Sequence, residues 1–267
     1  MKQRILTGIL LVAAVLGALA LPSRFFAPLA AGLTLLLVYE WVRLCRTSRR
    51  AKLIFALMLP LAMSLCLVWP QLGEALYRPV VIGNILMWSV IVILLITSPM
   101  VLGHSLWGKY GPELGALLLF GFWLTLTQLH SQHIWLLMTT LAGVTLFDTF
   151  ALVWGIQFGK RKLSPKLSPG KTWEGVAGGT LAALTPIAIL ALADSKNWIN
   201  SHAWYIPAVA LSIAIAPFGD LFESLLKRLQ GVKDSGVLLP GHGGLLDRVD
   251  SHLAVVPFCA FFALVFA

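Results

Sequence analysis

The run IWLLMTTLAGVTLFDTFALVW, residues 134–154, contains a single charged side chain, Asp148. A helix of about 20 apolar residues crosses the hydrocarbon core of a bilayer. The run lacks the polar–apolar alternation of a membrane barrel strand, so it predicts a transmembrane helix. The whole chain is 58% hydrophobic and 12% charged, whereas soluble domains have roughly 45–50% apolar and about 25% charged residues. The sequence therefore predicts an integral membrane protein.

Further apolar runs lie on both sides of this one, and together they predict an all-α polytopic bundle of about nine transmembrane helices. The expected spans are residues 5–21, 25–44, 53–69, 80–102, 114–129, 134–154, 176–193, 203–219 and 253–267. The first run also resembles a secretory signal peptide, but a second apolar run follows at once, which favours a first span. We expect residues 1–130 to form a transmembrane scaffold and residues 131–267 a transmembrane catalytic region.

The positive charges indicate how the bundle is oriented. With nine spans, the N-terminus and the even-numbered loops share one side, and 17 of the 20 Lys and Arg residues lie there. Positive residues concentrate on the cytoplasmic side, so we expect a multi-pass protein of the inner membrane with a cytoplasmic N-terminus. The net charge of +9 is then explained by topology and does not call for nucleic acid as a partner. The polar loops 155–175 and 221–249 are expected on this same face.

The most polar long segment is SLLKRLQGVKDSGVLLPGHGGLLDRVD, residues 224–250. It combines cations, carboxylates and a glycine-rich turn, a mixture that beside apolar helices suggests a site for a phosphorylated, metal-complexed substrate. His242 in that turn is read as a hydrogen-bond donor rather than a proton shuttle. The cations are Lys227, Arg228 and Lys233, and the carboxylates are Asp234, Asp247 and Asp250.

Two carboxylates suggest a magnesium site. Asp220, Glu223 and Lys227 follow one another at helical spacings of three and four and would share one face. A surface row of ion pairs is the plain interpretation of that spacing. Together with Asp247, however, Asp220 is expected to coordinate a divalent cation, and two hard oxygen donors suit Mg²⁺ better than zinc.

Asp148 and the loop after it form a second polar group. A carboxylate inside a membrane helix costs about 2.5–3.5 kcal/mol on insertion scales, so a helix–helix hydrogen bond, a metal or a basic residue must offset it. The loop 158–175 carries five cations, and a helix is expected to begin near Trp173 and Glu174. The first amides of that helix, after Lys171 and Thr172, would face an anion such as a triphosphate.

Taken together, these motifs resemble the phosphatidate cytidylyltransferase family, the CDP-diacylglycerol synthases. The family signature is S-x-hydrophobic-K-R-x4-K-D-x-small-x2-hydrophobic-P-x-H-G-G-hydrophobic-x-D-R-hydrophobic-D, and residues 224–250 fill every fixed position. Residues 168–175, SPGKTWEG, resemble a second family element, SPxKTxEG. One departure lies at residues 148–152, where the family commonly has Asp-Thr-Gly-Ala-Tyr and this chain has Asp-Thr-Phe-Ala-Leu.

The resemblance implies a fold with two cytoplasmic catalytic loops, and a reaction in which phosphatidic acid attacks CTP to give CDP-diacylglycerol and pyrophosphate. It also implies membrane lipids and a second copy of the chain as partners. Mg²⁺, with a second cation as an option, would be held by Asp220 and Asp247, with Asp148 and Glu223 as weaker candidates. The expected catalytic residues are Lys227, Arg228, Asp234, His242, Arg248 and Asp250. The expected substrate-binding residues are Ser168, Lys171, Thr172, Glu174, Ser224, Lys233, Gly243 and Gly244.

Three alternatives remain open at this level. The acceptor could be another lipid phosphate, such as an isoprenoid one. The intramembrane carboxylates would also suit a cation-coupled transporter, although that class does not explain the Lys-Asp-Gly-His cluster. A catalytically silent membrane scaffold is favoured only by the altered residues Phe150 and Leu152.

Overall fold

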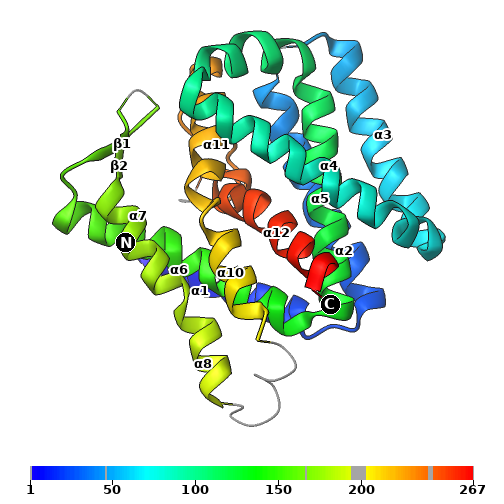
Figure 1. Ribbon diagram of the computed structural model, residues 1–267. Helices are drawn as coiled ribbons and strands as arrows, with labels where there is room; N and C mark the ends of the chain where they lie inside the picture. Colours follow the sequence, from blue (N-terminus) through cyan, green and yellow to red (C-terminus); the bar gives the residue numbers. More distant parts are fainter. Residues whose placement is uncertain (1, 46, 166, 194–202, 240–242, 267) are drawn as a thin grey trace.

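The computed structural model describes residues 2–45, 47–165, 167–193, 203–239 and 243–266 (Figure 1). Within these ranges the chain is helical apart from one short hairpin and the connecting turns. The first helices are α1 (Lys2–Leu19), α2 (Ser23–Leu44), α3 (Arg49–Val68), α4 (Pro70–Thr97), the π-helix η1 (Val101–Trp107) and α5 (Gly108–Gln132). They are followed by α6 (Ile134–Phe158), β1 (Lys162–Ser164), β2 (Ser168–Thr172), α7 (Trp173–Ala183), α8 (Thr185–Ala193), α10 (Tyr205–Ile213), α11 (Ala216–Gln230) and α12 (Leu246–Phe266).

Eight helical segments in the described residues are long and apolar enough to cross a membrane. Two of them are composite, because α7 and α8 together make Trp173–Ala193, and α10 and α11 together make Tyr205–Gln230. The all-α, multi-pass architecture is therefore confirmed. The expected first span forms α1, which is not among the eight found in the described residues, so the ninth span stays a prediction.

Two helices extend well beyond their apolar runs. The run 203–219 continues as α11 to Gln230, and the run 253–267 begins seven residues early as α12 at Leu246. Much of the expected loop 221–249 is consequently helix. Polar side chains on the added turns bind one another across the two helices, which removes the cost of unpaired charges there.

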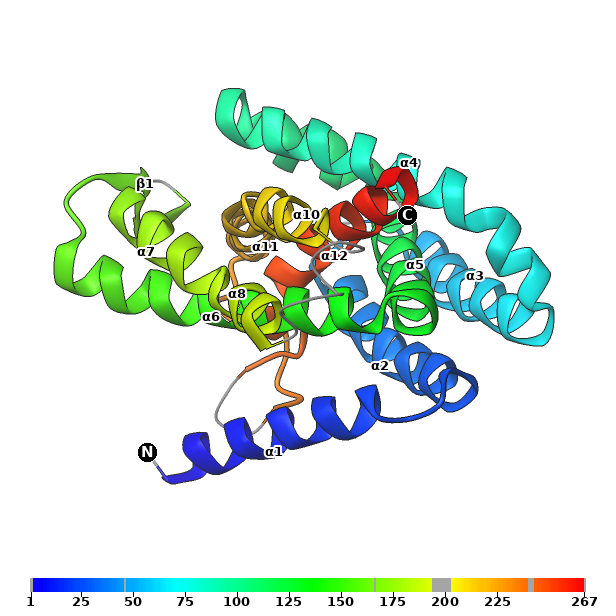
Figure 2. The same cartoon turned by 60° about the horizontal axis from the view of Figure 1, so that its bottom comes forward.

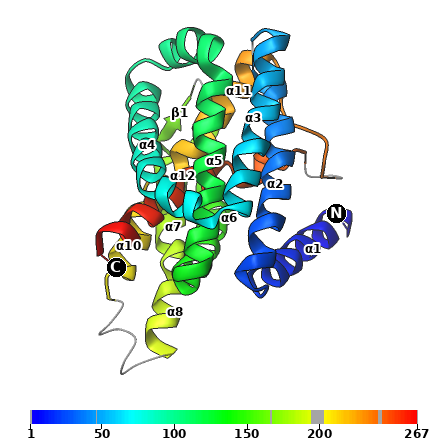
Figure 3. The ribbon, with the colours of Figure 1, turned by 90° about the vertical axis from the view of Figure 1, so that its right-hand side faces the viewer.

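Helix α12 lies at the centre of the bundle, where it packs against α4, α5, α6, α10 and α11 (Figures 1 and 3). Most of its side chains are buried, including the small residues Ala254, Cys259 and Ala260. Helix α1 differs sharply, because α2 is its main neighbour and Leu10, Val12 and Leu16 are more than half exposed (Figure 2). The core is thus built around the last helix in chain order.

Polar groups fix the helices of the first half to one another. The Asn84 side-chain nitrogen on α4 donates to the Leu117 carbonyl on α5 at 2.9 Å, where Gly121 leaves room for it. At the end of α2, the Leu44 carbonyl accepts from Trp107 Nε1 at 3.0 Å and from Gln230 Nε2 at 2.6 Å. The final carbonyls of a helix lack intrahelical partners, so these two donors tie η1 and α11 to the end of α2.

The segment expected as a basic loop contains a two-stranded antiparallel hairpin. Strand β1 pairs with β2 in the register Lys162 to Thr172 and Ser164 to Ser168. The hairpin stands at the junction of α6 and α7, which pack side by side along their lengths (Figure 2). Glycines permit this close contact, because a Cβ at Gly179 would lie 2.7 Å from the Phe147 carbonyl oxygen.

Candidate active site

The centre of the site is an ion cluster between α11 and α12. Lys227 Nζ lies 2.6 Å from Glu223 Oε2, one turn earlier on α11, and 2.6 Å from Asp247 Oδ1 in the first turn of α12. All three side chains are at most 16% exposed. The expected row along α11 therefore exists for Glu223 and Lys227, but it is internal and includes Asp247 as its third member.

The second oxygen of Asp247 is held by the backbone. Asp247 Oδ2 accepts from the Ser235 amide at 3.0 Å, the Gly244 amide at 2.8 Å and the Ser235 hydroxyl at 3.0 Å. The loop can turn back onto α12 because Gly231, which ends α11, and Gly243 have positive φ angles of 69° and 83°. The loop amides thus bind Oδ2 of Asp247, and this leaves Oδ1 directed toward Lys227.

Asp220 forms a second ion pair, which joins the two polar segments of the sequence. Its carboxylate contacts the ammonium of Lys171 on β2 and accepts from the Ser224 hydroxyl at 3.2 Å. The hairpin and α11 are therefore in direct contact at Asp220. Lys171 and Ser224 were both expected to bind substrate, and here they flank the carboxylate expected to bind metal.

Two further carboxylates complete the group. Asp148 on α6 accepts from the Ser251 hydroxyl at 3.0 Å, so a helix–helix hydrogen bond, one of the three alternatives for this carboxylate, is present. Asp250 is 8% exposed and interacts electrostatically with Asp148, Asp220 and Glu223. Asp250 and the three carboxylates with which it interacts therefore come together from α6, α11 and α12.

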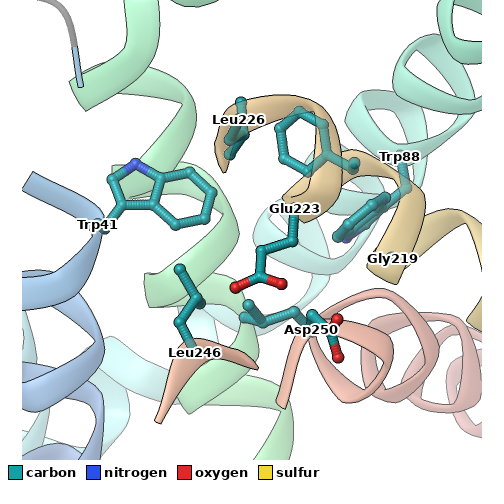
Figure 4. Close-up of a pocket in the computed structure, with 9 residues that line it drawn as sticks. Trp41, Trp88, Gly219, Glu223, Leu226, Leu246 and Asp250 are labelled. Carbon is teal, nitrogen blue, oxygen red and sulfur yellow. The ribbon is translucent and has the colours of Figure 1, made fainter. Parts of the chain in front are cut away.

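A small internal pocket adjoins Glu223 and Asp250 (Figure 4). Figure 4 shows the Glu223 side chain reaching from α11 toward α12, between Trp41 and Trp88 and next to Leu246 and Asp250. Glu223 Oε1 and Trp88 Nε1 are buried without a hydrogen-bond partner among the described residues. An unsatisfied carboxylate oxygen inside a protein is costly, so this oxygen is available to a further ligand.

The remaining residues of the hairpin segment serve the local structure. Thr172 is the N-cap of α7, and its hydroxyl accepts from the Gly175 amide at 3.1 Å. Glu174 accepts from the Lys160 amide at 3.0 Å and from the Arg161 amide at 3.1 Å, which fastens the start of the hairpin. Ser168 pairs with Ser164 in the hairpin. Where these residues lie relative to a nucleotide stays a prediction.

Several expected site residues lie at the outer edge of the cluster. Arg228, Lys233, Asp234 and Arg248 are exposed, and Gly243 and Gly244 form the turn beneath Asp247. His242 lies outside the described residues. The altered positions Phe150 and Leu152 are 39% and 65% exposed on α6, whereas Asp148 on the same helix faces Ser251 on α12. The departure from the family pattern therefore falls largely on the outer surface.

Sequence reasoning missed Glu40 and Ser235. Glu40 on α2 is fully buried and accepts from the Leu245 amide at 3.0 Å, the Leu246 amide at 2.7 Å and the Ser235 hydroxyl at 3.1 Å. The signal was available, because Glu40 is a carboxylate inside the apolar run 25–44, as Asp148 is inside 134–154. Only the fold shows that its partners are about 200 residues away.

The donor set is compatible with Mg²⁺, which prefers carboxylate oxygens. Glu223 Oε1 supplies an unsatisfied oxygen beside Asp250, and Asp220 and Asp247 lie on the same two helices. Within the described part of the chain, no three His, Cys, Asp or Glu side chains are already gathered as a metal site. Lysines instead contact Asp220 and Asp247, so the metal site stays a prediction.

Comparison with known proteins gives consistent matches. Residues 2–266 match the family described as "Cytidylyltransferase family". A protein named phosphatidate cytidylyltransferase from Haemophilus influenzae is 35% identical over 289 residues, which cover 98% of each chain. A protein of the same name from Pseudomonas aeruginosa is 34% identical over 97% of this chain and 96% of its own. One from Thermotoga maritima is 46% identical over 121 residues, 44% of each chain.

Proposed function

The chain belongs to the cytidylyltransferase family, and from this premise we propose that it transfers the cytidylyl group of CTP to phosphatidic acid. The products are CDP-diacylglycerol and pyrophosphate, as used in phospholipid synthesis. One observation carries the proposal: Lys227 lies between Glu223 and Asp247 while Lys171 contacts Asp220, so two ammonium groups and several carboxylates meet in one membrane bundle. Such a group suits two phosphorylated substrates, one of them a lipid.

The chemistry follows from charge. A phosphate oxygen of phosphatidic acid attacks the α-phosphorus of CTP, a new phosphorus–oxygen bond forms, and the bond to the pyrophosphate leaving group breaks. Both reactants are anions, so bringing them together and stabilising charge on the leaving group are the main demands. Lys171, Lys227, Arg228 and Arg248 would neutralise the phosphates. The attacking phosphate is already ionised near neutral pH, so no residue needs to act as a general base.

Asp220 and Asp247, with Asp148 and Glu223, would hold Mg²⁺ and, if present, a second cation. When bound, Mg²⁺ would offset phosphate charge and favour departure of pyrophosphate. The protein residues have a separate task, which is to orient these carboxylates. Ser224 holds Asp220, Ser251 holds Asp148, and the Ser235 and Gly244 amides hold Asp247.

The proposal includes location and assembly. The lipid tails stay in the bilayer while CTP is water-soluble, so we place the site at the cytoplasmic face of the inner membrane, as the distribution of Lys and Arg favours. A homodimer is also proposed, on the family resemblance alone. Light scattering of the protein in detergent, corrected for bound detergent, measures that state.

The test is Mg²⁺-dependent release of pyrophosphate by purified protein in micelles with CTP and phosphatidic acid. Asp247→Asn should reduce the rate at least about a hundredfold, because it removes the charge that faces Lys227 and the cation. Glu113→Gln makes the same kind of change at an exposed position and should leave the rate unchanged. A folded wild type that forms no CDP-diacylglycerol would exclude this substrate pair. Turnover with another lipid phosphate would then support a different acceptor, and ion flux in proteoliposomes would support a transporter.

A further inference from the structure

Glu40 is a buried carboxylate in the helix that was expected to be scaffold. It is 0% exposed, and its two oxygens lie within hydrogen-bond distance of three donors, all in residues 235–246. Two of the donors are the amides of Leu245 and Leu246, at the start of α12. Amides at the start of a helix lack intrahelical acceptors and carry partial positive charge, so a carboxylate is the favoured partner there.

The residues that Glu40 binds are adjacent to those that hold Asp247. Ser235 lies 3.1 Å from Glu40 Oε2 and 3.0 Å from Asp247 Oδ2 through the same hydroxyl, which has only one proton to donate. The Ser235 amide donates to Asp247 as well. On the other side, Gly244 donates to Asp247 and the next two amides donate to Glu40. Both segments that orient Asp247 are therefore fixed to α2.

Two glycines provide the space that Glu40 occupies. A Cβ placed on Gly236 would collide with the Glu40 carboxylate, and a Cβ on Gly244 would lie 2.8 Å from Glu40 Oε2. Gly236 follows Ser235 and Gly244 precedes Leu245, so each glycine is next in sequence to a donor to Glu40. Because neither glycine has a side chain, the Glu40 carboxylate can approach both Ser235 and the amides of Leu245 and Leu246.

We propose that Glu40 is a positioning residue for Asp247. It fixes Ser235 and the first turn of α12, and so holds Asp247 with Oδ2 on the loop amides and Oδ1 toward Lys227. This role rests on the proposed function insofar as Asp247 acts on the substrates. The hydrogen-bonded connection itself does not depend on which substrates are used.

The test compares Glu40→Gln with wild type in two measurements. Gln has nearly the same shape, but one of its two ends is a donor, so at least one bond to residues 235–246 is lost. Hydrogen exchange should become about tenfold faster for the amides of Ser235, Gly244, Leu245 and Leu246, since a hydrogen bond to a charged acceptor protects an amide more strongly than one to a neutral acceptor. In the assay, kcat should fall about tenfold and the Mg²⁺ concentration for half-maximal rate should rise, while KM for CTP stays within about twofold.

The matched control is Glu113→Gln, which changes an exposed carboxylate on α5 and should alter neither measurement. Wild-type exchange in residues 235–246 of Glu40→Gln would overturn the proposal. A variant that is only less stable, with wild-type kcat and Mg²⁺ dependence per folded molecule, would also overturn it. If wild type lacks activity with CTP and phosphatidic acid, the proposed function fails, whereas the exchange measurement still decides the role of Glu40.

A second variant keeps the proposal testable if Glu40→Gln does not fold. Ser235→Ala removes the hydroxyl between the two carboxylates but keeps the amide that binds Asp247. It should lower kcat severalfold without changing KM for CTP. Where both variants fold, the double variant should lose less than the product of the two single effects, because both act through Asp247. Wild-type kcat in Ser235→Ala would contradict the connection.

Discussion

At the residue scale, Lys227 separates two carboxylates that are nearly withdrawn from solvent. The side chains of Glu223 and Asp247 are only 4% and 10% exposed. Lys227→Met would leave these two carboxylates with two buried negative charges and no ammonium group between them. Breaking a buried ion pair by removing one partner costs about 3–5 kcal/mol. We therefore expect a clearly lower thermal unfolding temperature for the variant in detergent.

A compensating change distinguishes charge from packing. Adding Glu223→Gln to Lys227→Met removes one of the two unpaired charges and should recover part of the lost unfolding temperature. Equal unfolding temperatures for wild type and Lys227→Met would mean that the cluster contributes nothing to stability. Activity should stay low in both variants, because neither has the ammonium group proposed to contact phosphate.

The sequence motifs already named most residues that the structure brings together in the candidate site, since these residues lie in two short stretches. Their pairing could not be predicted. Helical spacing correctly placed Glu223 and Lys227 one turn apart, but it could not show that Asp220 contacts Lys171 on another element. Glu40 was missed because it is the single carboxylate of the run 25–44, and its partners become neighbours only when α2 and α12 pack together.

At the element scale, the hairpin is positioned by the contact between α6 and α7. Gly179 packs against the backbone of Phe147, so Gly179→Ala forces the two helices apart. Overpacking of this kind costs about 1–3 kcal/mol, and we expect lower stability together with lower activity, because Lys171 moves with the hairpin. Thermal unfolding and pyrophosphate release measure the two effects.

Gly32→Ala is the control, since nothing lies within 4 Å of a Cβ at that helical position. Alanine there should be neutral or stabilising by up to about 1 kcal/mol. If the two alanine variants behave alike, close packing of α6 and α7 does not support the site.

Hydropathy located the helices but not their ends. It follows the apolar run, so it ended the eighth span at residue 219 and began the ninth at 253, whereas α11 runs to Gln230 and α12 starts at Leu246. The added turns are polar and form because their charges pair with each other. The strands β1 and β2 were missed for a similar reason, since Ser-Pro and Pro-Gly pairs indicate turns more strongly than strands.

At the scale of the whole molecule, orientation can be tested with single cysteines. The native thiols of Cys45, Cys66 and Cys259 are buried, and burial raises the pKa of the Cys45 thiol to about 12. Maleimides react with thiolates, so this background should label weakly. Exposed positions flank α2 on opposite sides of the expected membrane, Arg24 at its start and Arg50 at the start of α3.

In intact cells, a membrane-impermeant maleimide should label Arg24→Cys, and it should label Arg50→Cys only after permeabilisation. The reason is the distribution of positive residues, which favours a cytoplasmic position for residues 43–52. The reverse pattern would invert the proposed topology. Labelling of both sites after permeabilisation serves as the control for accessibility.

The hydrogen bonds between Glu40 and α12 can form only late in synthesis of the chain. Chains are made from the N-terminus, so α2 leaves the ribosome before the amides of Leu245 and Leu246 have been synthesised. Through the insertion of α3 to α11, Glu40 would lack these donors and remain an uncompensated acid near the end of α2. In a chain that stops before α12, Glu40 therefore has no donors from Leu245 and Leu246. An incomplete chain thus differs from a complete one by an unpaired buried carboxylate.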